Sequence, residues 1–320
     1  MLLTTNYSLL TSMKLFSGSS HRALAEAVAK ELKIDLGKVE LKTFSSGEQY
    51  VRYEESVRGK DVFIIQTGSE TTDSDVLETC LMCQAAKLSF AKSVHLVMPH
   101  FPYARQDRVS QPREPISAKL ISDLLVTSGA DHIITLNLHA DQIQGFSDVP
   151  MDALESHKLF CDEFKKKKLE NLVVVSPDAG GTKAAKIFAD KLGANLAVMH
   201  KTRPAHNEAS ILHVVGEIEG KTAIIYDDMI DTAGSICAAK ETLMNADANP
   251  DVYIAATHPI FSGPAIERLT EAKFKEVMVT DSIPLEGKNF PGLTVCSIAP
   301  MLAEVIEHVE KGESVTDMYK

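Results

Sequence analysis

The residues best suited to chemistry lie in one short stretch, Thr222–Ser235, which reads TAIIYDDMIDTAGS. Its apolar start, Thr222–Tyr226, predicts a buried parallel strand, and the alanine-rich sequence from Ile236 predicts a helix. Between the two, the backbone N–H groups of four small residues can converge on one anion, with the helix dipole behind them. These four residues are Thr232, Ala233, Gly234 and Ser235.

Three carboxylates beside this loop restrict its ligand: those of Asp227, Asp228 and Asp231. They would repel a free phosphate, whereas the hydroxyl groups of a sugar phosphate can donate hydrogen bonds to them. We therefore predict a pocket for ribose 5-phosphate, in which the loop binds the phosphate and the acids bind the ring hydroxyls. The alternative is an ordinary strand-to-helix turn with solvated acids. We also expect Gly234 to provide backbone freedom or close approach to the phosphate.

The elements that must position this loop recur in the first half of the chain. Asp61–Gln66 (DVFIIQ) and Thr222–Asp227 (TAIIYD) are apolar strands preceded by Gly-Lys. Each leads through a polar loop and a helix to another strand, Val94–Pro99 or Val252–Pro259. This alternation predicts an α/β fold of two duplicated domains, each a mainly parallel sheet flanked by helices.

The two copies differ in the loop that follows the first of these strands. Only the second copy keeps the compact acidic loop, because the first has GSETTDSD at Gly68–Asp75. We assign ribose 5-phosphate to the second domain, and the nucleotide and assembly to the first. The predicted boundaries are a tail at residues 1–12, an N-terminal domain at 13–153 and a C-terminal domain at 154–320. The last segment of the chain is expected to pack near the N-terminal domain.

Composition excludes several classes of partner. The 320 residues contain 33 Lys and Arg against 44 Asp and Glu, a net charge of −11, which argues against nucleic acid. The sequence contains no run that could span a membrane, and Met1–Ser12 lacks the basic start of a signal peptide. Five scattered cysteines fit a reducing cytoplasm, and the CxxC of Cys80 and Cys83 is assigned to helix packing rather than zinc.

Several further stretches, in order along residues 14–319, resemble ribose-phosphate pyrophosphokinases. They are VMPHFPYARQDR at Val97–Arg108, KLFSGSSH at Lys14–His21, LHADQIQGF at Leu138–Phe146, VSPDAGG at Val175–Gly181, HKTR at His200–Arg203, IFSGPAIERL at Ile260–Leu269 and GESV at Gly312–Val315. The resemblance implies two phosphoribosyltransferase-like domains that transfer the diphosphoryl group of ATP to the 1-hydroxyl of ribose 5-phosphate. The products would be 5-phosphoribosyl 1-pyrophosphate, a precursor of nucleotides, histidine and tryptophan, and AMP.

The resemblance places metal ligands at His139 and Asp178, for the Mg²⁺ that a triphosphate requires. Both residues follow apolar runs, Ile133–Leu138 and Leu172–Val175, and we expect them at strand C-termini, where such sheets bind ligands. From the residues alone, a core histidine that is hydrogen-bonded to backbone is the favoured interpretation of His139, and the matching context LHADQIQGF reverses that preference.

Nucleotide contacts are implied at five positions. Arg105 offers a bidentate fork for phosphate, and Gln106 can read an adenine edge or a ribose hydroxyl. Phe44 and Glu48, in TFSSGEQY, match an aromatic residue and an acid that the family brings across from a neighbouring subunit. Ser46 stands between them where relatives often have Asp or Asn, and its shorter side chain puts that contact in question.

Two cations match the family's catalytic loop. Lys201 and Arg203 follow the predicted strand Leu196–Met199, and their implied role is to neutralise charge on the transferring group and on the departing AMP. Taken alone, two surface cations after a strand are usually solvated.

Two rival functions remain at this point. A non-catalytic regulatory subunit of a synthetase complex is the closest alternative, although such a protein should lose the acids or cations that this chain retains. A phosphoribosyltransferase would share the phosphate loop, but it would not need ARQD, a duplicated domain or an ATP pocket. The resemblance further implies a homo-oligomer, a hexamer built from dimers.

The resemblance also implies a regulatory site between subunits, where phosphate activates many relatives and ADP inhibits them. The retained contributors to this anion site are Ser56, Arg58, Arg113, Gln144 and Ser314. Asp141, by contrast, stands where relatives often have Ser, and Thr316–Tyr319 replaces their common Ser-Tyr-Leu-Phe ending.

We predict that phosphate activation and allosteric ADP inhibition are weaker than in phosphate-dependent relatives, with ADP still competing at the ATP site. The reason is that a like-charge pair at short range costs ~1–4 kcal/mol, depending on screening. Titration of phosphate against initial rate is the measurement. Asp141→Ser is expected to tighten the apparent affinity for phosphate about tenfold or more. Strong activation of the wild type, unaltered by Asp141→Ser, would show that this carboxylate turns to solvent.

Overall fold

The computed structural model describes residues 12–202 and 211–315 and divides into two compact units. The first unit comprises the described residues of Met1–Glu155, Ser282–Pro284 and Ser297–Lys320. The second comprises Ser156–Asp281 and Leu285–Cys296. The chain therefore passes between units at Glu155–Ser156, and its last helix belongs to the first unit. Among the described residues, no helix combines the length and the apolar character that crossing a membrane requires.

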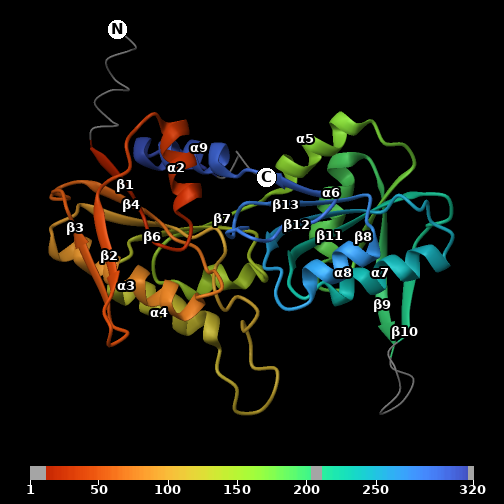
Figure 1. Ribbon diagram of the computed structural model, residues 1–320, viewed down its shortest axis with the longest axis horizontal. Coiled ribbons are helices and arrows are strands. Elements are labelled where there is room, and N and C mark those ends of the chain that lie inside the picture. The colour runs from red at the N-terminus through yellow and green to blue at the C-terminus, as the bar shows by residue number, and fades with distance from the viewer. Residues whose placement is uncertain (1–11, 203–210, 316–320) are drawn as a thin grey trace, which may run out of the picture. The chain divides into compact units, whose positions relative to one another are not determined.

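The first unit contains a parallel five-stranded sheet in the order β1-β4-β5-β6-β7. Figure 1 shows α2 and α9, which contact each other, on one side of this sheet, and α3 and α4 on the other. A short 3₁₀ helix, η1 (Asp141–Phe146), follows β6. The strands are β1 Met13–Ser17, β4 Asp61–Ile65, β5 Ser93–Val97, β6 His132–Leu136 and β7 Met151–Leu154, and the helices are α2 Arg22–Leu32, α3 Thr72–Leu88, α4 Ser117–Ser128 and α9 Ala299–Lys311.

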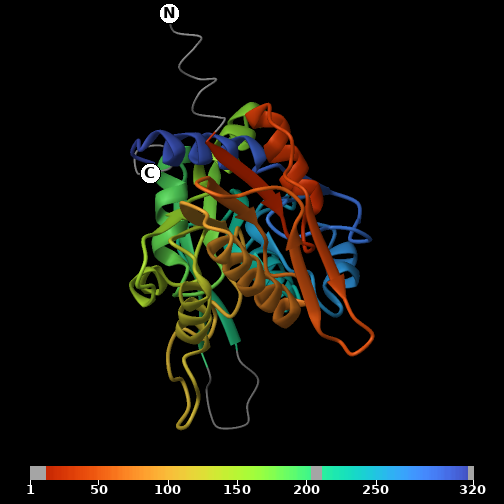
Figure 2. The same ribbon diagram turned by 90° about the vertical axis from the view of Figure 1, so that its left-hand side faces the viewer.

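A separate antiparallel hairpin, β2 (Val39–Thr43) and β3 (Gln49–Tyr53), interrupts this series. Figure 2 shows it extending beyond the five-stranded sheet of its own unit. Tyr53 ties the base of the hairpin to the unit by donating a hydrogen bond to the backbone carbonyl of Met82 at 3.0 Å. The turn of the hairpin, residues 44–48, is exposed.

The second unit contains a seven-stranded sheet in the order β10-β9-β8-β11-β12-β13-β14, parallel except for the β9–β10 pair. Helices α5 and α6 pack on one face of the sheet, and α7 and α8 pack on the other. The strands are β8 Leu172–Ser176, β9 Asn195–Thr202, β10 Ile211–Val215, β11 Thr222–Ile230, β12 Tyr253–Pro259, β13 Glu276–Thr280 and β14 Leu293–Cys296, and the helices are α5 His157–Lys167, α6 Thr182–Leu192, α7 Gly234–Asn245 and α8 Ala265–Ala272.

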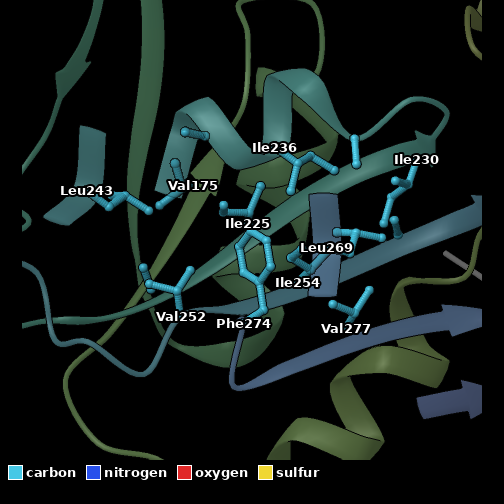
Figure 3. Close-up of a cluster of buried hydrophobic side chains, with 14 of the residues drawn as sticks. Val175, Ile225, Ile230, Ile236, Leu243, Val252, Ile254, Leu269, Phe274 and Val277 are labelled. Atoms are coloured by element: carbon cyan, nitrogen blue, oxygen red, sulfur yellow. The ribbon is translucent and has the colours of Figure 1, made fainter. Parts of the chain in front are cut away.

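The core beneath α7 and α8 fixes these helices on the sheet. Ile236 of α7 and Leu269 of α8 lie over Ile225 of β11 and Ile254 of β12, and all four side chains are fully buried (Figure 3). Burying a side chain of this size contributes about 1.5–3 kcal/mol. The helix that follows β11 is thus held by apolar packing, independently of any ligand at its N-terminus.

The strand order confirms the predicted α/β class of two mainly parallel sheets flanked by helices. It also shows the repeat directly. In the first unit β1 pairs with β4, and β5, β6 and β7 follow in order; in the second, β8 pairs with β11, and β12, β13 and β14 follow in order. The hairpin β2–β3 and the pair β9–β10 occupy the same place in the two series, but only β9 joins its main sheet.

Candidate functional site

Strand β11 is longer than the sequence predicted and includes two of the acids. We expected a strand that ends at Tyr226 or Asp227, but it runs to Ile230, because pairing with β12 continues through Asp227 opposite Ala256 and Ile230 opposite Pro259. Asp227 and Asp228 are therefore both strand residues, and both are half-buried. The loop itself shrinks to Asp231, Thr232 and Ala233, because α7 begins at Gly234 instead of Ile236.

The backbone turns into α7 at Ala233, which adopts the left-handed conformation with φ 60° and ψ 5°. Such a conformation next to right-handed helical residues points successive N–H groups toward one place, as an anion-binding nest requires. The conformation costs an L-residue roughly 1–2 kcal/mol. Ala233 keeps it because its side chain is buried in the core with Ile230 and Ile236.

The expected reason for Gly234 is partly wrong. Its φ lies outside the left-handed region, so the backbone does not need glycine there. A Cβ at this position would instead meet the Nη1 atom of Arg268 at 3.4 Å. Arg268, on α8, is the residue that sequence reasoning missed. The only signal was its place in the stretch IFSGPAIERL, which carried no predicted role.

The electrostatics of the site are dominated by its carboxylates. Burial, and then the neighbouring Asp228 carboxylate, raise the pKa of Asp227 well above its ordinary value, and Asp178 adds to the same effect. Asp178 lies two residues beyond β8, the strand beside β11, as the sequence predicted for a strand C-terminus. It is exposed, and its Oδ1 accepts a hydrogen bond from the Gly181 N–H at 2.9 Å. This edge of the sheet therefore favours cations and hydrogen-bond donors.

The part of the chain that the structure describes does not by itself assemble a complete metal site. Among residues 12–202 and 211–315, no group of three or more His, Cys, Asp and Glu side chains has an arrangement that could hold a metal ion. His139 is exposed in the first unit, three residues beyond β6, because that strand ends at Leu136 rather than at the expected Leu138. Asp178 belongs to the second unit. Mg²⁺ retains several waters and needs only one or two carboxylates, so the oxygen atoms near Asp178 and Asp227 fit its chemistry.

The predicted nucleotide residues are surface residues of the first unit. Phe44 is 49% exposed in the turn of the β2–β3 hairpin, where the Ser46 hydroxyl donates to Glu48 at 2.9 Å. Arg105 and Gln106 are exposed after β5, and Gln106 Oε1 accepts a hydrogen bond from the Ser117 hydroxyl at 2.5 Å. The hairpin thus brings Phe44, Ser46 and Glu48 together, while Arg105 and Gln106 lie on a different segment.

One predicted catalytic cation lies in a strand. We expected Lys201 to follow a strand ending at Met199, but β9 extends to Thr202 because β10 pairs with it, placing Leu212 opposite Lys201. Arg203 lies outside the described residues.

The predicted regulatory residues are all exposed and all in the first unit. Ser56 and Arg58 line a pocket of about 490 Å³ beside β3 and α3, in which the Arg58 guanidinium lies 4.3 Å from the centre of the Phe90 ring. Asp141 begins η1, and Gln144 lies in its last turn. Arg113, in the loop before α4, and Ser314, after α9, complete the set.

The corresponding loop of the first unit is hydrogen-bonded to a carboxylate of the protein itself. The buried carboxylate of Asp75, in the first turns of α3, accepts hydrogen bonds from the Ser69 N–H at 2.8 Å and the Ser69 hydroxyl at 2.7 Å. It also accepts one from the Thr71 hydroxyl at 3.1 Å. In the loop that follows β4, these donor groups of Ser69 and Thr71 are therefore already hydrogen-bonded to the Asp75 side chain.

Two mainly parallel sheets flanked by helices, with an acidic loop before α7 in the second unit, define an α/β protein. A family model described as the N-terminal domain of ribose phosphate pyrophosphokinase matches residues 13–129, and one described as a phosphoribosyl synthetase-associated domain matches residues 203–320. The chain belongs to the ribose-phosphate pyrophosphokinase family, which confirms the resemblance drawn from the motifs.

Full-length relatives support this assignment. The ribose-phosphate pyrophosphokinase of Bacillus caldolyticus is 45% identical over 308 residues, which are 96% of this chain and 98% of that protein. That of Oceanobacillus iheyensis is 44% identical over 310 residues, 97% and 98% of the two chains. The crystal structure of phosphoribosylpyrophosphate synthetase from Mycobacterium smegmatis superposes with a TM-score of 0.90 at 44% identity, covering 94% of this chain and 99% of that one.

The raised pKa of Asp227 predicts a stability penalty at neutral pH. Because its folded-state pKa lies above the unfolded value, stability is lost as pH rises from the ordinary aspartate pKa toward the raised one. Asp227→Asn, without ligands, should therefore raise the Tm at pH 7–8, by ~2–4 °C for each kcal/mol relieved, and the gain should shrink toward pH 4. Thermal unfolding against pH measures this. Asp190→Asn, which removes an exposed carboxylate of α6, is the matched control. A gain of equal size at both pH values would contradict the account.

Proposed function

We propose that the protein transfers the diphosphoryl group of ATP to the 1-hydroxyl of ribose 5-phosphate, giving 5-phosphoribosyl 1-pyrophosphate and AMP. The observation that carries the proposal is the loop after β11. It combines a nest-forming residue, a helix N-terminus and three neighbouring aspartates in a chain that aligns with ribose-phosphate pyrophosphokinases over nearly its whole length. A phosphate fits the N–H groups of Thr232–Ser235, and ring hydroxyls fit the carboxylates of Asp227, Asp228 and Asp231.

The chemistry asks the protein mainly to position its substrates and neutralise charge. The 1-hydroxyl oxygen attacks the β-phosphorus of ATP and releases its proton, the bond from that phosphorus to the α–β bridging oxygen breaks, and AMP leaves with that oxygen. The protein's part is to hold the sugar at the β11 loop and to place Lys201 and Arg203 against the charge that develops on the transferring group and on AMP.

Mg²⁺ is part of this proposal, with His139 and Asp178 as the residues that would hold it. When bound, it supplies positive charge to the triphosphate and the diphosphate product. The exposed Asp178 carboxylate and the cation-favouring field around Asp227 support it.

For the nucleotide, we infer that Arg105 and Gln106 contact ATP from one chain while Phe44, Ser46 and Glu48 reach it from a neighbouring subunit. The exposed turn of the β2–β3 hairpin supports a role outside its own unit. A homo-oligomer, a hexamer built from dimers in the cytoplasm, follows from the same inference. Leu77 of α3 and Leu120 and Leu124 of α4, large apolar side chains exposed on two packed helices, support association.

An assay that measures AMP formed from ATP and ribose 5-phosphate tests the proposed function. Wild type should form AMP only when both substrates are present. Lys201→Ala and Arg203→Ala should each lower kcat about 10²-fold or more, with smaller changes in KM, because the cations act chiefly in the transition state. Lys221→Ala, which removes a cation of the same unit at the start of β11, is the control. Absence of AMP in wild type would favour a non-catalytic subunit, and unchanged kcat in both variants would remove the cations from the mechanism.

The metal proposal predicts that activity requires Mg²⁺. A chelator should abolish AMP formation, and excess Mg²⁺ should restore it. His139→Ala should raise the Mg²⁺ concentration needed for half-maximal rate, while His213→Ala, on β10, should not. Full activity in chelator would refute the metal requirement, and an unchanged Mg²⁺ titration for His139→Ala would remove that residue from the site.

A further inference from the structure

The loop after β11 is hydrogen-bonded to a second segment, Phe261–Arg268, which we call the bracing segment. Pairing between β11 and β12 ends at Ile230 opposite Pro259, yet contacts continue beyond it. The Phe261 N–H donates to the Ile230 carbonyl at 2.9 Å, and the Ser262 N–H donates to the Asp231 carbonyl at 3.0 Å. The Ser262 hydroxyl also donates to Asp231 Oδ1. The bracing segment thus fixes both the backbone and the carboxylate that open the loop.

Arg268 completes this series at the next residue. Its Nη1 atom donates to the Thr232 carbonyl at 2.9 Å, so three successive carbonyls, of residues 230 to 232, are bonded to the bracing segment. A peptide whose carbonyl is fixed in this way cannot rotate freely, and the N–H group of the next residue is then fixed as well. For Thr232, the next N–H belongs to Ala233, at the centre of the nest.

Arg268 also lies beside Gly234. A Cβ added at position 234 would be 3.4 Å from Nη1 of Arg268, in van der Waals contact with the guanidinium. The guanidinium therefore lies beside the first turn of α7. A guanidinium there adds positive charge at a helix N-terminus that already favours anions.

We propose that Arg268 is a positioning residue for the sugar-phosphate loop. It holds the Thr232 carbonyl, keeps the neighbouring N–H groups directed at the phosphate, and offsets part of the negative charge of the nearby aspartates. This inference rests on the proposed function, because it takes ribose 5-phosphate as the ligand of the loop. Ser262 supports the same loop through Asp231.

Steady-state kinetics and calorimetric titration with ribose 5-phosphate test this role. Arg268→Ala should raise both the KM and the Kd for ribose 5-phosphate about tenfold or more, equivalent to ~1.4 kcal/mol, with the KM for ATP within about twofold of wild type. Arg268→Lys keeps the charge but not the planar fork, so it should restore only part of the affinity. Ser262→Ala should weaken the binding of ribose 5-phosphate and leave the KM for ATP unchanged.

Lys275→Ala is the matched control, because it removes one exposed cation of the same unit whose partner is Asp251. It should leave all constants unchanged, and thermal unfolding should show that every variant is folded. Arg268→Ala with wild-type affinity for ribose 5-phosphate would overturn the inference, as would full restoration by Arg268→Lys, which would reduce the role to charge alone. A wild type that binds ribose 5-phosphate without forming AMP would contradict the proposed function and leave the test of Arg268 intact.

Discussion

The site depends on one strand, β11, which is hydrogen-bonded to a neighbouring strand on each side. Its pairing with β8 and β12 carries Asp227 and Asp228 to the carboxyl edge of the sheet and partly removes them from water. Charge held in such a place is costly, which is why the pKa of Asp227 is raised. The hydroxyl donors or the cation of the proposed function would offset this cost. The same strand delivers the chain into the left-handed turn at Ala233 and then into α7.

The duplicated architecture shows how one fold can support a site in one copy and close it in the other. Both copies have a strand, a loop and a helix in the same order. In the first, the Asp75 carboxylate takes the loop donors of Ser69 and Thr71. In the second, the bracing segment donates hydrogen bonds to the carbonyls of residues 230 to 232 and does not bond to the N–H groups that we propose for the phosphate. The fold supplies the helix N-terminus in both copies, and a few side chains decide what it binds.

The sequence predicted the sheet class, the repeat and the acidic loop, because apolar strands and small-residue turns are local patterns. It did not predict that the strand continues through Asp228 to Ile230, because pairing with β12 is a long-range interaction that no local pattern of β11 contains. The same reason extended β9 through Lys201. Arg268 was missed because it lies 36 residues from the carbonyl it binds, on a helix whose own sequence gives no sign of that contact. Of the two roles expected for Gly234, backbone freedom is wrong because its φ lies outside the left-handed region, and close approach to the phosphate stays a prediction.

The central claim is that the loop after β11 binds the phosphate of ribose 5-phosphate through its backbone and the sugar through its acids. A crystal structure of the protein with ribose 5-phosphate tests this directly. We expect phosphate oxygens within about 2.7–3.2 Å of the N–H groups of Thr232–Ser235, and ring hydroxyls within hydrogen-bond distance of the Asp227 or Asp228 carboxylates. A sugar phosphate bound instead at the Ser69–Asp75 loop, or bound in the second unit with its phosphate away from the N-terminus of α7, would contradict the account.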